Sequence, residues 1–160
     1  MWIPVSVLSW ALVVGMTSAR SNGAPAIACS DMTPLHGVDP QPPPSPYSLT
    51  YSVADTGYNV VLEAAGGDSF KGFFIQAREP GTSNLIGAFN FDSSDIQYVD
   101  CSGGTNNAVT HTSSSEKTKI EVTWEPSIGF TGEAVFTASV VRVKTEFWVR
   151  QESDVIIIQS

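Results

Sequence analysis

The sequence predicts an all-β protein: an antiparallel β-sandwich of about eight or nine strands that follows an irregular, proline-rich N-terminal arm. After residue 46, short segments alternate apolar with polar residues, as expected for strands whose side chains point to opposite faces of a sheet. Gly, Pro, Asp and Asn separate these segments at the close intervals typical of a sandwich. Outside the first nineteen residues, no window shows the spacing of an amphipathic helix.

Residues 1–19 have the pattern of a secretory signal peptide. Trp2–Met16 is mostly apolar but short for a bilayer span, and the small residues Thr17-Ser18-Ala19 follow it. We expect cleavage near Ala19 or a few residues later, which leaves residues 20–160 as a single domain. No later apolar run is long enough to span a membrane. The sequence therefore predicts a secreted, extracellular protein.

The chain has two cysteines, Cys29 and Cys101. An even number of cysteines in an oxidising compartment predicts a disulfide, and the alternative is two buried free thiols. The bridge would close a long loop, worth on the order of 4 kcal/mol in the chain-entropy model.

Ser21–Pro46 forms the predicted arm. Its many prolines exclude regular helix and central strand, and Pro40–Pro46 resembles polyproline helix. That stretch is either a ligand for an aromatic groove on another protein or a stiff connector across the end of the sandwich. The connector is the commoner role.

Strand patterns begin directly after the arm. Tyr47–Val53 and Tyr58–Ala64 alternate with period two and are separated by a turn. Phe70–Arg78 and Asn84–Phe91 are predicted to form a hairpin, because the turn Glu79–Ser83 contains Pro followed by Gly. Neither face of Phe70–Arg78 is purely polar, so we expect this strand in the middle of a sheet.

The second half of the chain adds further strand patterns. Thr118–Trp124 alternates most clearly, with Ile120 and Val122 on the face opposite Lys119 and Glu121. The remaining predicted strands are Ile96–Cys101, Ala108–Thr112, Ala134–Val143, Glu146–Val149 and Asp154–Ile158.

Charge and aromatic content suggest where a ligand could bind. The net charge of -8 argues against nucleic acid and against docking on anionic lipid by bulk attraction. Arg142, Lys144 and Arg150 could form a local basic patch, although ordinary solvated surface is the commoner interpretation. Phe147 and Trp148 lie beside Arg150, and such aromatic residues are favoured at binding surfaces. Alternatively, one of the pair is core and the other covers a sheet edge.

No catalytic motif is present, so we expect neither an enzyme nor a cofactor. The two histidines, His36 and His111, could join Asp31, Asp39 or Asp100 in a metal site if the disulfide draws these segments together. We favour the other interpretation, in which both histidines bind backbone groups near the bridge. The sequence therefore predicts no metal site.

Short segments from Gly23 to Val149 form one further pattern. They are Gly23-Ala24-Pro25 with Cys29, Met32, His36-Gly37, Pro46-Tyr47, Gly72–Arg78, Ile86-Gly87-Ala88-Phe89, Cys101, Val109-Thr110-His111-Thr112, Val122-Thr123-Trp124, Gly132, Phe136–Val141 and Phe147-Trp148-Val149. In this order they resemble the reeler (reelin-type) domain family, with residues 20–160 as a single reeler domain.

The resemblance implies a variant immunoglobulin-like β-sandwich, with Cys29 and Cys101 as the family's paired cysteines. Stand-alone chains of this length resemble small secreted defence proteins of invertebrates. This implies an innate-immunity protein that binds a microbial surface glycan or lipid, with antimicrobial action as one form of that role. The alternative is an extracellular matrix or adhesive module that binds a host protein and has no immune role. The family offers no binding motif to transfer, so the resemblance names no site.

Overall fold

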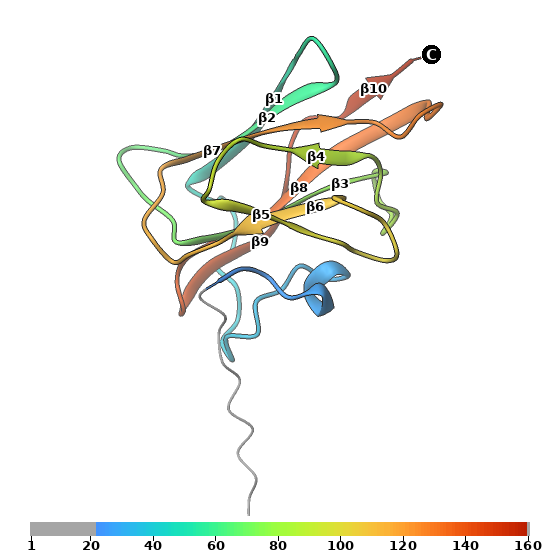
Figure 1. Ribbon diagram of the computed structural model, residues 1–160. Helices are drawn as coiled ribbons and strands as arrows, with labels where there is room; N and C mark the ends of the chain where they lie inside the picture. Colours follow the sequence, from blue (N-terminus) through green and yellow to red (C-terminus); the bar gives the residue numbers. More distant parts are fainter. Residues whose placement is uncertain (1–21, 160) are drawn as a thin grey trace, which may run out of the picture.

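The computed structural model describes residues 22–159 and confirms an antiparallel β-sandwich. Two sheets lie face to face (Figure 1). The four-stranded sheet has the order β1-β2-β7-β4. The six-stranded sheet has the order β10-β8-β3-β6-β5, with β9 also paired to β8. The described residues contain ten strands: β1 (Tyr47–Val53), β2 (Tyr58–Ala64), β3 (Gly72–Arg78), β4 (Ala88–Asn90), β5 (Ile96–Val99), β6 (Ala108–His111), β7 (Lys119–Glu125), β8 (Gly132–Val143), β9 (Glu146–Glu152) and β10 (Ile156–Ile158).

Strand β3 lies between β8 and β6, and every residue in it is buried. The prediction of a central strand is confirmed. One face of β3 carries Phe73, Ile75 and Ala77 into the core between the sheets. The other face carries Phe74, Gln76 and Arg78, and these side chains are buried as well. A covering layer must therefore lie on the outer face of the six-stranded sheet.

The structure confirms the turn of the predicted hairpin but not the pairing of its two strands. The chain does reverse at Glu79–Ser83, where the Ile86 N–H donates to the Ala77 carbonyl at 3.0 Å. Beyond this reversal, β4 pairs with β7 in the opposite sheet. Gly87, with φ 67°, makes the crossing. Any Cβ at this position would collide with the Glu125 carbonyl oxygen and the Trp124 ring, so the crossing requires glycine.

The core between the sheets is built around Trp124, which is fully buried on β7. Its indole ring meets Phe136 of β8 edge-on, with ring centroids 5.2 Å apart. The indole N–H donates to the Ile86 carbonyl at 3.0 Å, so the one polar atom of this large side chain is satisfied. This contact ties the crossing segment before β4 to the centre of the sandwich.

The N-terminal arm is the covering layer. It lies beside the six-stranded sheet (blue in Figure 1) and contains the 3-10 helix η1 (Ala26–Cys29). Cys29 and Cys101 form the predicted disulfide. A second, smaller core joins the arm to the outer face of this sheet, and it comprises Ala28, Cys29, Met32, Phe74, Val99, Cys101 and Ala108.

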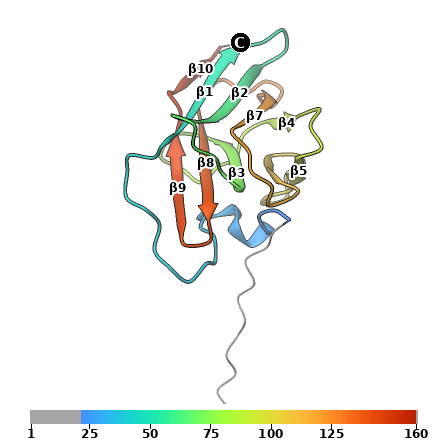
Figure 2. The same cartoon turned by 90° about the vertical axis from the view of Figure 1, so that its left-hand side faces the viewer.

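The proline-rich part of the arm continues along β9 to the start of β1 (Figure 2). The Gln41 N–H donates to the Phe147 carbonyl at 2.8 Å, which holds this stretch against the edge of the sheet. The structure thus shows Pro40–Pro46 as a connector within the domain.

The predicted signal peptide lies outside the described residues. Between residues 22 and 159, no helix is long and apolar enough to cross a membrane.

Candidate functional site

A pocket of about 720 Å³ lies between the N-terminal arm and the outer face of the six-stranded sheet; we call it the arm pocket. Its volume falls within the range of about 300–1,000 Å³ that is typical of small-molecule sites. Phe74 of β3 and Val141 of β8 contribute to the sheet side, and Ala28, Met32 and Leu35 contribute to the arm side. The walls of the arm pocket are therefore largely apolar.

The pocket floor depends on a glycine in β3. Gly72 has no side chain, and the ring of His111 lies directly beside it: a Cβ at Gly72 would come within 2.9 Å of His111 Cε1. Gly72 and His111 both line the arm pocket. The missing side chain lets the imidazole lie against the sheet, and a larger residue at Gly72 would push the ring away.

His111 is a buried, neutral side chain. The Phe73 N–H donates to its Nδ1 at 3.2 Å, and the Phe73 carbonyl lies 3.3 Å from the same nitrogen. Burial lowers the pKa of His111, although a backbone hydrogen bond to Phe73 acts in the opposite direction; the nearby Lys117 ammonium lowers it further. The neutral form is consequently the folded-state form near pH 7.

His36 closes the pocket from the arm side. Its ring meets Phe147 edge-on, with ring centroids 5.2 Å apart. Burial lowers the pKa of His36 as well, and its Nδ1 is buried without a protein partner. Both histidines thus line one pocket. However, no group of three or more His, Cys, Asp or Glu side chains that could hold a metal occurs in residues 22–159.

A buried cation attaches the arm to the sheet. Arg78 is 1 % exposed, and its Nη2 donates to the carbonyls of Cys29 at 2.9 Å and Ser30 at 3.2 Å. Gln76 donates to the same Cys29 carbonyl at 3.1 Å and accepts from Arg78 Nε at 2.9 Å. Burial, followed by the nearby Arg150 charge, lowers the pKa of Arg78. These contacts fix the arm at the position where it forms the pocket wall.

The pocket mouth combines aliphatic and cationic side chains. Ile27, Leu35 and Val143 all line the pocket, although they are 76 %, 60 % and 41 % exposed. Lys71 and Lys144 line it as well. Exposed apolar side chains gathered at a concave site are typical of a binding surface.

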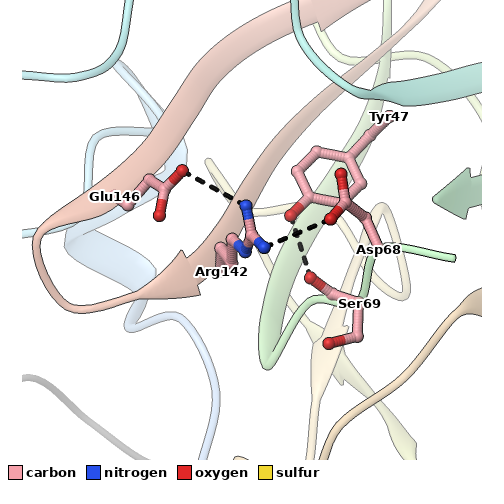
Figure 3. A network of polar contacts seen from close by, with 5 residues as sticks. All are labelled: Tyr47, Asp68, Ser69, Arg142 and Glu146. Carbon is pink, nitrogen blue, oxygen red and sulfur yellow. Dashed lines mark hydrogen bonds and ion pairs between the residues drawn. The ribbon is translucent and has the colours of Figure 1, made fainter. Parts of the chain in front are cut away.

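The structure places the three predicted basic residues in different environments. Arg142 forms ion pairs with Asp68 at 3.2 Å and Glu146 at 3.5 Å (Figure 3). Its charge is therefore balanced by two carboxylates. Lys144 follows the end of β8 and lines the arm pocket. Arg150 lies farther along β9, where its backbone N–H donates to Ser139 Oγ at 3.2 Å.

Phe147 and Trp148 are both buried, which contradicts a place on an exposed binding surface and agrees with the alternative interpretation, in which one of the pair is core. Phe147 is 0 % exposed and Trp148 is 8 % exposed. Alternation along β9 sends Trp148 into the core, where it packs edge-on against Tyr47 with centroids 5.4 Å apart. Phe147 points to the outer face, but His36 of the arm covers it. Both rings therefore stabilise the fold.

The pocket residues Phe74, Val141, Ile27 and Leu35 were not singled out in the sequence. A signal for two of them was present: Phe74 and Val141 lie on the outer faces of neighbouring strands, where an uncovered sheet would carry polar residues. The apolar residues on both faces of β3 do indicate that both faces are covered. They do not indicate that the N-terminal arm is the segment that covers the outer face.

The comparisons with known proteins agree with this architecture. The model of the Reeler domain family matches residues 27–160. A Bombyx mori protein named "Putative defense protein" is 38% identical over 156 residues, covering 91% of this chain and 89% of that protein. "Defense protein l(2)34Fc" of Drosophila melanogaster is 38% identical over 135 residues, covering 82% and 84% respectively.

A solved structure has a similar fold. The human F-spondin reeler domain superimposes with a TM-score of 0.63 at 22% identity, covering 78% of this chain and 97% of that one. The family match and the identity to both insect proteins together show that this chain belongs to the reeler domain family.

Proposed function

We propose that this chain is a secreted defence protein that binds microbial surface components through the arm pocket and acts by recognition without catalysis. The names of the insect relatives support a defence-related role. The disulfide suits an oxidising, extracellular compartment. The observation that carries the choice of site is the apolar arm pocket, whose mouth keeps three aliphatic side chains exposed.

The direct test is retention of the oxidised protein on microbial surfaces. Purified protein would be mixed with intact bacteria, insoluble β-glucan or host extracellular matrix, and the bound fraction measured after washing. Val143→Trp blocks the mouth of the pocket at the last residue of β8. Val53→Trp is the matched control, because Val53 is the last residue of β1, is 80 % exposed and lies outside the arm pocket.

We expect bacteria or β-glucan to retain the wild type and the Val53→Trp control, and Val143→Trp to lose at least about tenfold in apparent affinity. Retention on host matrix alone would favour the alternative, an adhesive module without immune role. Equal retention of both tryptophan variants would contradict the arm pocket as the recognition site. Induction of the transcript after bacterial challenge provides an independent test, because a structural matrix protein should not respond.

A further inference from the structure

We infer that the arm pocket binds the acyl chain of a single-chain amphiphile whose anionic head group lies at the pocket mouth. This inference deepens the proposed function, because it names the ligand class of the same pocket. It can nevertheless fail independently, since recognition of microbes could use other groups of their surface.

The first argument is the chemistry of the walls. Val141 and Val143 from the sheet and Ile27 and Leu35 from the arm line the cavity and keep hydrocarbon surface accessible to solvent. Met32 and Phe74 lie behind this surface, already buried in the smaller core that joins the arm to the sheet. A ligand that fills this space gains by removing apolar surface from water. An acyl chain meets that requirement.

The second argument is against a sugar as the main occupant. Sugar hydroxyls need hydrogen-bond partners when they are buried, because an unpaired polar group loses its hydration. The uncharged polar side chains that line the pocket are Ser30, Thr33, Ser114 and Ser139, together with the imidazoles of His36 and His111. One of these, Ser139, already accepts a hydrogen bond from the Arg150 backbone. A glycan ring could pair with these groups, but its hydroxyl groups would lack partners along the apolar wall formed by Leu35, Val141 and Val143.

The third argument is the charge at the mouth. Lys71 and Lys144 line the pocket, and Asp31 is the acidic residue that lines it with them. The ion pairs of the described residues are formed by Lys119 and Arg142, so neither pocket lysine is engaged in one. This local excess of cations runs against the net charge of -8. Ammonium groups at the mouth would bind a carboxylate or phosphate by charge-assisted hydrogen bonds.

A buried cation adds to this local field. Lys117 is 6 % exposed, and its ammonium donates to the carbonyls of Ser113 at 2.9 Å and Ser115 at 2.8 Å. It thereby holds the loop that contributes Ser114 to the pocket. Its charge also lies close enough to His111 to lower that side chain's pKa. An anionic head group near this side of the pocket is therefore favoured electrostatically.

The test uses a fluorescent acyl probe, 11-(dansylamino)undecanoic acid, with the purified, oxidised protein. We expect saturable enhancement of probe fluorescence at one site per chain. Palmitate and palmitoyl lysophosphatidylglycerol should displace the probe, whereas uncharged monopalmitin should require about tenfold higher concentration. Displacement by palmitate alone would assign a carboxylate head group, and displacement by the lysophospholipid alone would assign a phosphate.

Three variants locate the site. Val143→Trp should weaken probe binding at least about tenfold while Val53→Trp leaves it unchanged. Replacing Lys71 and Lys144 together with Gln should abolish the preference for anionic amphiphiles and leave monopalmitin binding unaltered. If Val143→Trp fails to fold, Leu35→Asp replaces it, because Leu35 lies at the exposed mouth and a carboxylate there would repel the head group.

Absence of saturable probe binding, or equal binding by Val143→Trp and Val53→Trp, would overturn the acyl-chain assignment. Retention of the protein on bacteria without probe binding would refute this inference and leave the proposed function standing. Probe binding without retention on any microbial surface would support the acyl-chain assignment and contradict the proposed function.

Discussion

Arg78 shows how a single side chain determines where the arm lies. Its guanidinium is buried, and its partners are the Gln76 amide oxygen and two arm carbonyls. Removing it leaves the buried amide oxygen of Gln76 without its donors, whereas the Cys29 carbonyl keeps its hydrogen bond from the Gln76 amide nitrogen. An unpaired buried acceptor costs about 1–3 kcal/mol.

We therefore expect Arg78→Met to lower the free energy of unfolding by about 2–4 kcal/mol. Urea unfolding of the oxidised protein measures this change. Lys119→Met is the matched control, because Lys119 forms an exposed pair with Glu121 at 3.2 Å. It should alter stability by no more than about 0.5 kcal/mol. An Arg78→Met variant as stable as the control would contradict the role assigned to this contact.

His111 should make the fold sensitive to mild acid. Burial makes its pKa lower in the folded protein than the ordinary histidine pKa of about 6.5, so the unfolded chain takes up this proton first as the pH falls. The free energy of unfolding should therefore decrease as the pH falls through about 6.5, with a slope of at most about 1.4 kcal/mol per pH unit for one proton.

His111→Gln keeps an acceptor for the Phe73 N–H and removes the titration. Its stability should change less than that of the wild type between about pH 7.5 and 5.5. His36→Gln should remove a separate share of the dependence, since its pKa is also lowered. Thermal unfolding of the wild type and both variants across this pH range measures each contribution to the pH dependence. Parallel curves for the wild type and His111→Gln would count against a buried neutral imidazole.

Among the individual residues, the sequence predicted the Cys29–Cys101 bridge correctly, because pairing needed only the compartment and the even cysteine count. For Phe147 and Trp148 the sequence left two interpretations open, and the structure agrees with the one that makes one of the pair core; their burial depends on the arm and on the partner sheet. The proposed ligand roles of Arg142, Lys144 and Arg150 stay predictions.

The crossing from β3 to β4 is the clearest element that local sequence could not place. The turn chemistry of Glu79–Ser83 was recognised correctly, yet a turn does not say which sheet receives the next strand. That depends on Gly87, whose backbone passes against Trp124 and Glu125 of β7. By contrast, β1 and β2 were predicted to the residue, because each alternates cleanly and they pair with each other as neighbours.

Two alanine substitutions separate the cost of a left-handed backbone from the cost of a steric clash. Gly81 and Gly87 both have positive φ, 72° and 67°, but only Gly87 has atoms within 4 Å of an added Cβ. We expect Gly81→Ala to cost about 1 kcal/mol for the left-handed backbone alone. Gly87→Ala should cost about 3 kcal/mol or more, because backbone atoms must move. Denaturant unfolding measures both. Similar losses for the two variants would mean that the crossing tolerates a side chain.

The disulfide should contribute most to keeping the arm in place. It joins residues 72 positions apart, so its loss should reduce the free energy of unfolding by on the order of 4 kcal/mol in the chain-entropy model. The double variant Cys29→Ser with Cys101→Ser tests this by urea unfolding without reductant. A loss below about 1 kcal/mol would show that the smaller core and Arg78 hold the arm unaided.

At the scale of the whole molecule, the arm forms a third layer over the sandwich (Figure 1). The arm pocket lies between this layer and the six-stranded sheet. Strand periodicity predicts two sheets well, because one face of each must be buried. The arm has no periodicity, so the sequence could not say which face it covers. The arm pocket could therefore not be predicted from the sequence, although the apolar residues on both faces of β3 indicated that both faces are buried.

Hydrogen exchange of the oxidised protein, free and bound to solubilised bacterial envelope, tests the central claim most directly. The arm pocket predicts added protection in residues 26–36 of the arm and residues 139–144 at the end of β8. It predicts no change in the turn between β1 and β2, which lies outside the pocket. Protection confined to that turn, or binding with no added protection in the arm, would contradict it.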